Sequence, residues 1–119
     1  MNLYIPSLGT QLTLAAPWTF DLENEERNDS LRKLLNIPSP VNKEWWYDRI
    51  SDTRRVTLPA GTVLSVDRYY IRQNNESHDS ITFNLVSHPA FPPTKKTKLA
   101  RFWVHLRDAN YMRIEEIVS

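Results

Sequence analysis

Apolar side chains at every second position characterise four segments of this chain, and this period restricts the possible folds more than any other feature of the sequence. The pattern is clearest in 99–107, where an apolar set alternates with a polar and aromatic set: Ala100, Phe102, Val104 and Leu106 against Arg101, Trp103, His105 and Arg107. Successive side chains of a strand point to opposite faces, whereas a helix repeats about every 3.6 residues. Residues 12–22, 63–72, 80–86 and 99–107 are therefore predicted to form strands with one buried face.

Shorter signals fill the gaps between these strands. Pro17 interrupts 12–22 and must either confine that strand to a sheet edge or break it in two. The strands at 63–72 and 80–86 are predicted to form a hairpin. Two further strands are predicted at 55–58 and 111–118. A turn that contains proline and glycine is predicted at 58–62.

One segment has a different period. Leu31, Leu34 and Leu35 follow the i, i+3, i+4 spacing of a helix, and Asp29 or Ser30 is available as its N-cap. Pro38 is expected to stop this helix, because proline disfavours helical backbone in the residue before it. The sequence therefore predicts one short helix inside 24–37.

Composition agrees with a small β protein. The 119 residues suit a single domain spanning 1–119, and 40% hydrophobic residues are enough to form a core. Many short strands, one helix and only two glycines predict a mainly β fold: a small antiparallel barrel or sandwich of SH3-like or OB-like size.

The sequence lacks the residues and motifs that most catalytic and metal sites require. The absence of cysteine excludes thiolate metal sites and cysteine nucleophiles, and His78, His88 and His105 lack metal-ligand spacing. Gly9 and Gly61 belong to no phosphate-binding loop. We therefore expect no metal, no cofactor and no enzymatic activity.

The polar face of 99–107 is the candidate binding surface. If the apolar set faces the core, then Arg101, Trp103, His105 and Arg107 form a row on the other side that could stack bases or a planar ligand. The alternative is that a second sheet or the helix covers Trp103. A basic run precedes the row and is either part of the surface or a solvated loop: Lys95, Lys96 and Lys98.

Three stretches in the middle of the chain resemble small uncharacterised accessory proteins of phages and prophages. They are Leu58-Pro-Ala-Gly-Thr-Val-Leu, Val66-Asp-Arg-Tyr-Tyr-Ile-Arg and Asp79-Ser-Ile-Thr-Phe, about thirty residues in all. The resemblance implies no site residue. It implies a context in which many small domains act by binding host machinery.

The leading hypothesis is a non-enzymatic binding protein of phage type that occupies a host protein surface and inhibits a host defence system. The alternative is a nucleic-acid-binding β-barrel that uses the basic and aromatic strand, and a third is an unrecognised enzyme or nucleotide-ligand binder.

The net charge of +1 favours neither nucleic acid nor membrane through bulk charge. Residues 1–6 lack a signal-peptide pattern and no apolar run reaches the roughly 18–20 residues of a membrane span, so we expect a cytoplasmic protein, in the host cytoplasm if phage-encoded. Trp45, Trp46 and Tyr47 are a second candidate surface.

Overall fold

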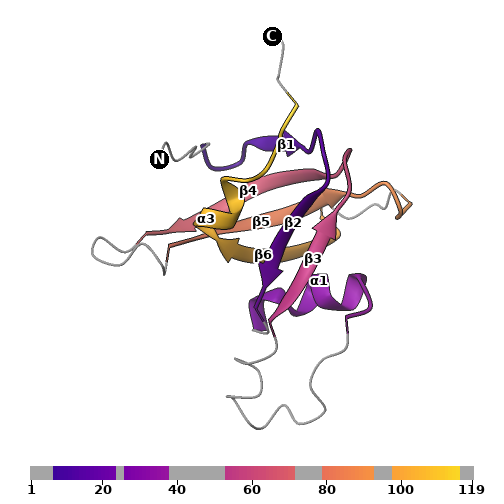
Figure 1. Cartoon of the computed structure of the whole chain (residues 1–119), viewed down its shortest axis with the longest axis horizontal. Coiled ribbons are helices and arrows are strands. Elements are labelled where there is room, and N and C mark those ends of the chain that lie inside the picture. Colours follow the sequence, from indigo (N-terminus) through magenta and orange to yellow (C-terminus); the bar gives the residue numbers. More distant parts are fainter. Residues whose placement is uncertain (1–6, 24–25, 38–52, 72–78, 93–97, 116–119) are drawn as a thin grey trace, which may run out of the picture.

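The computed structural model describes residues 7–23, 26–37, 53–71, 79–92 and 98–115. Six strands and three short helical segments make up this part of the chain (Figure 1). In chain order they are β1 (Gln11–Thr13), β2 (Trp18–Leu22), the 3-10 helix η1 (Glu26–Asn28), α1 (Asp29–Leu34), β3 (Arg54–Leu58), β4 (Val63–Tyr70), β5 (Ser80–Ser87), β6 (Ala100–His105) and α3 (Leu106–Ala109).

The strands form two antiparallel sheets in two layers. One sheet has four strands in the order β1-β4-β5-β6, and the other is the two-stranded ribbon β2-β3. The ribbon crosses the face of the larger sheet at a steep angle, and α1 lies beside β6 (Figure 1). The predicted mainly β, antiparallel fold is confirmed as a sandwich. The barrel alternative is wrong, because the four-stranded sheet is not closed in the described part of the chain.

The predicted strand at 12–22 is broken at Pro17. Its first part pairs with β4 as β1, whereas its second part pairs with β3 as β2. The alternation nevertheless holds on both sides of the break, and the large apolar members of the pattern are buried: Leu12, Leu14, Trp18, Phe20 and Leu22. The segment therefore crosses from one layer to the other while its apolar side chains stay between them.

Four aromatic rings fill the space between the two layers. Trp18 and Phe20 come from the ribbon, and Phe83 and Phe102 come from the larger sheet. Phe20 stacks on Phe102 with ring centroids 5.4 Å apart, and Trp18 meets Phe83 edge to face at 5.9 Å. The Trp18 indole also donates a hydrogen bond to the Asp108 carbonyl at 2.9 Å, so its polar atom is satisfied in the core.

The predicted helix forms but both of its ends differ from the prediction. The N-cap is Asn28, not Asp29 or Ser30, and its side chain makes no capping hydrogen bond. At the other end Asn36 has a left-handed backbone (φ 57°), with hydrogen bonds from Asn36 to Lys33 and from Ile37 to Arg32. These bonds form a Schellman motif, which ends the helix before Pro38 is reached.

Two predictions near the C-terminus are wrong. Strand β6 ends at His105, and α3 follows it directly, so Arg107 lies on a helical turn instead of on the predicted strand. In place of a strand at 111–118, the described residues form a single bridge between Ile114 and Leu14. Residues 116–119 lie outside the described part of the chain.

Candidate binding surface on strand β6

The predicted orientation of β6 is confirmed. The apolar residues of the predicted strand, of which Leu106 lies on α3, are buried with relative exposures between 0 and 3%: Ala100, Phe102, Val104 and Leu106. Arg101, Trp103 and His105 point to the other side and are half-buried. We call these three residues the β6 outer face. Arg107 is exposed on α3 and does not belong to this row.

Side chains from η1 and α1 cover the free edge of β6. The Ser30 hydroxyl donates to the Arg101 carbonyl and accepts from the Arg101 N–H, both at 2.9 Å. The Asn28 carbonyl oxygen accepts from the Trp103 N–H at 2.7 Å. These two side chains occupy the positions where a neighbouring strand would bind, so the edge cannot pair further.

Asn28 is fully buried and has a second task. Its amide nitrogen donates to the Glu23 carbonyl at 2.9 Å, so the same side chain holds both the end of β2 and the backbone of Trp103. A buried side-chain amide bonded on both sides fixes the segments that it joins. This explains why Asn28 does not cap its own helix.

The Trp103 indole has a cation on its face and an imidazole at its edge. The Arg27 guanidinium carbon lies 5.3 Å from the ring centroid, within the range of a cation–π interaction. The His105 ring meets the indole nearly perpendicularly, at 83° and 5.4 Å between centroids. The sequence left open whether the helix covers Trp103. The helical segment covers it only in part, because Trp103 stays half-buried.

Glu23 connects His105 to the ribbon. Its carboxylate lies 3.1 Å from His105 Nε2 and accepts a hydrogen bond from the Thr53 hydroxyl at 2.8 Å. A nucleophilic site places the imidazole between the hydroxyl and the carboxylate, so that the imidazole can take the hydroxyl proton. Here the carboxylate stands in the middle, and this arrangement positions His105 without activating Thr53.

Polar side chains of β5 extend the β6 outer face. The cross-strand neighbours of Arg101, Trp103 and His105 are Asn84, Thr82 and Ser80, respectively. Two polar atoms in this area are buried without a hydrogen-bond partner, Asn84 Oδ1 and His105 Nδ1.

The remaining predicted site residues do not join this row in the described structure. Lys98 is exposed and lies before β6. Lys95 and Lys96 lie outside the described residues, as do Trp45, Trp46 and Tyr47. The sequence interpretation missed Arg27, Asn28 and Glu23, because no local pattern in 23–30 indicates contact with a strand more than seventy residues away.

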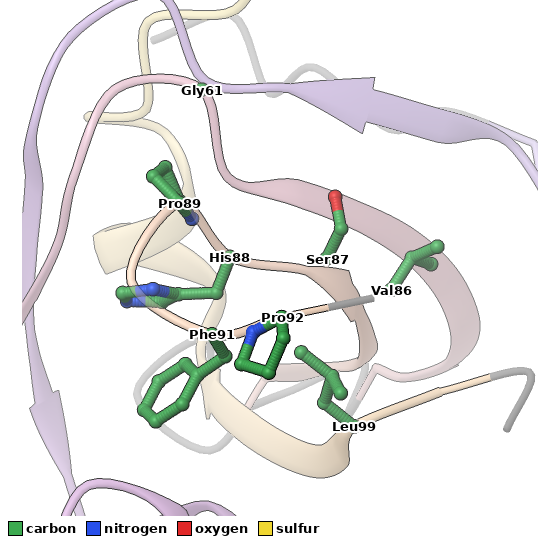
Figure 2. A pocket seen from close by; sticks show the side chains of 8 residues that line it. All are labelled: Gly61, Val86, Ser87, His88, Pro89, Phe91, Pro92 and Leu99. Atoms are coloured by element: carbon green, nitrogen blue, oxygen red, sulfur yellow. The ribbon is translucent and has the colours of Figure 1, made fainter. Parts of the chain in front are cut away.

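A separate pocket of about 270 Å³ lies at the far end of β5 (Figure 2). Its walls are mainly apolar and include Pro89, Phe91 and Leu99. His88 lies against Phe91, with 4.8 Å between ring centroids, and its Nδ1 accepts the Ala90 N–H at 3.0 Å. Burial lowers the pKa of His88 below its ordinary value. The imidazole therefore holds the 88–91 turn together in its neutral form.

The described residues contain no group of three or more His, Asp or Glu side chains that could hold a metal ion. Within the same ranges, no helix has the length and apolar character needed to cross a membrane.

No protein-family model, no curated protein and no solved structure matches this chain.

Proposed function

We propose that this chain is a non-enzymatic binding protein that occupies a surface of a host protein through the β6 outer face. The observation that carries the proposal is that neighbouring residues hold both the backbone and the ring of Trp103 in place. Its backbone N–H is bonded to Asn28, its ring contacts both Arg27 and His105, and its side chain remains partly exposed.

Tryptophan and arginine are the residue types that most often dominate protein interfaces. A side chain that is already held in place loses little conformational entropy when a partner binds, so more of the contact energy appears as affinity. Arg101 next to Trp103 supplies a second residue of this kind on the same face. From the resemblance of 58–64, 66–72 and 79–83 to phage accessory proteins, we further propose a host protein as the partner and inhibition of a host defence system as the consequence.

Binding of single-stranded nucleic acid is the second candidate. Arg27 and Arg101 beside an indole are the groups that such sites combine. A base would stack on a face of the ring, however, and Arg27 already occupies one face. Glu23 beside His105 also adds a negative charge to the surface. These contacts favour a protein partner.

Capture from host lysate separates the two candidates. The tagged chain is immobilised, and lysate is applied with and without nuclease at 50 and 200 mM salt. A protein partner is retained after nuclease treatment at both salt concentrations. Nucleic-acid binding instead disappears with nuclease, and the affinity for a labelled oligonucleotide falls about tenfold or more over this salt range, because counterions are released on binding. That second result would contradict the proposal.

A further inference from the structure

The described strands form two sheets with four edges, and three of these edges make hydrogen bonds to other described segments. The edge of β1 pairs with the segment around Ile114, through bonds from Ala15 N–H to the Arg113 carbonyl and from Glu115 N–H to the Thr13 carbonyl. Asn28 and Ser30 cover β6, as described above. The edge of β2 is bonded at one group, the Asp21 N–H, which donates to the Asp108 carboxylate at 3.2 Å.

The edge of β3 is different. Pro17 and Pro59 flank the β2-β3 ladder and lack N–H groups, so its hydrogen-bonded pairs must be Trp18 with Leu58, Phe20 with Val56 and Leu22 with Arg54. The outward N–H of Asp21 agrees with this phase. It follows that the N–H and C=O groups of Arg55 and Thr57 point away from β2. None of these four groups is bonded to another described residue.

Within the described residues this edge of β3 is open, and its charge favours an acidic partner strand. Arg54 and Arg55 are adjacent and exposed, and β3 itself has no acidic residue. The Arg55 side chain is 71% exposed although it contacts Asp21 of β2 at 3.0 Å. Pairing of β3 with a second copy would place no carboxylate of β3 opposite these arginines. An acidic strand would instead place carboxylates opposite them.

We propose that the open edge of β3 binds an extended acidic segment of another protein as an added strand. The four outward groups of Arg55 and Thr57 form its backbone hydrogen bonds, and Arg55 selects an acidic side chain on the solvent face. This is strand addition to an exposed sheet edge. The site lies in the ribbon layer, whereas the β6 outer face belongs to the larger sheet.

Amide hydrogen exchange of the whole chain tests the open edge directly. In the free protein the N–H groups of Arg55 and Thr57 should exchange rapidly, while those of Val56 and Leu58 are protected by β2. Protection of Arg55 and Thr57 that rises with protein concentration would show self-pairing and overturn the proposal. Protection at every concentration would show that the chain covers its own edge, which also overturns it.

A defined peptide tests the occupant. The probe is a blocked seven-residue peptide of alternating threonine and glutamate, and its matched control alternates threonine and lysine. Addition of the glutamate peptide should slow exchange at Arg55 and Thr57 by about tenfold or more at saturation, whereas the lysine peptide leaves it unchanged. Equal effects of the two peptides, or no effect of either, would overturn the acidic preference.

Two substitutions separate the backbone from the side chain. Thr57→Pro removes an outward N–H that β2 does not use, and proline is tolerated at such an edge position. It should weaken binding of the glutamate peptide by about tenfold. Thr57→Val keeps the N–H and should bind as the wild type does. Equal affinity of the wild type and both variants would contradict strand addition.

Discussion

At the scale of single residues, Asn28 has the largest predicted effect on stability outside the apolar core. Asn28→Ala leaves the Trp103 N–H and the Glu23 carbonyl without their buried partner. We expect a loss of about 2–3 kcal/mol in the free energy of unfolding, measured by urea denaturation, because each unsatisfied buried group costs about 1–3 kcal/mol. Ser30→Ala also removes two hydrogen bonds, but at an exposed position, and should cost about 1 kcal/mol or less because water can replace the hydroxyl. Equal losses in the two variants would contradict the role given to Asn28.

His88 gives the stability a defined pH dependence. Burial lowers the pKa of His88 in the folded protein, so the unfolded chain takes up this proton first as the pH falls. The stability that this imidazole contributes is complete above its unfolded pKa of about 6.5 and is lost as the pH falls through the lower folded pKa. Protonation of Nδ1 would also break its bond from the Ala90 N–H.

The measurement compares melting temperatures of the wild type and His88→Gln between pH 7.5 and 5. The wild type should lose more stability than the variant over this range, because only the wild type has His88. The carboxylates are the same in both proteins, so their contribution cancels in the comparison. Identical pH profiles would show that the folded environment does not disfavour the charged imidazole.

At the scale of elements, the orientation of β6 makes a prediction about its two faces. Phe102→Ala opens a cavity among the four aromatic rings and should cost about 3–5 kcal/mol. Arg101→Ala removes a side chain from the outer face and should change stability by only about 0.5 kcal/mol. Chemical denaturation of both variants checks this difference. A larger loss for Arg101→Ala would mean that the two faces of the strand are assigned the wrong way round.

The strands could be predicted from the sequence because their alternation is local. The same rule extended 99–107 too far, since Leu106 continues the period of two although it already begins α3. A four-residue helix is too short to show a helical period of its own. The side-chain use of Asn28 and Ser30 was also hidden, because the residues they bind, Trp103 and Arg101, are 75 and 71 positions away.

At the scale of the whole molecule, the candidate surface depends on contacts between distant segments. The sequence predicted the row of Arg101, Trp103 and His105 from one strand alone. It could not predict that Arg27 and Glu23 would join that row, because the path of the chain between the layers decides this. For Pro17 the sequence left two structures open, because a proline is compatible both with an edge strand and with a crossing between sheets.

The most direct test of the account is the Trp103→Ala variant, studied by thermal melting and by titration with the captured partner. We predict that the variant stays folded and binds about thirtyfold more weakly, a loss of about 2 kcal/mol. Tyr111→Ala, which removes a 77% exposed aromatic side chain outside β6, is the matched control and should bind as the wild type does. A Trp103→Ala variant that unfolds would show that Trp103 belongs to the core, and one that folds and binds with wild-type affinity would show that the β6 outer face is not the binding surface.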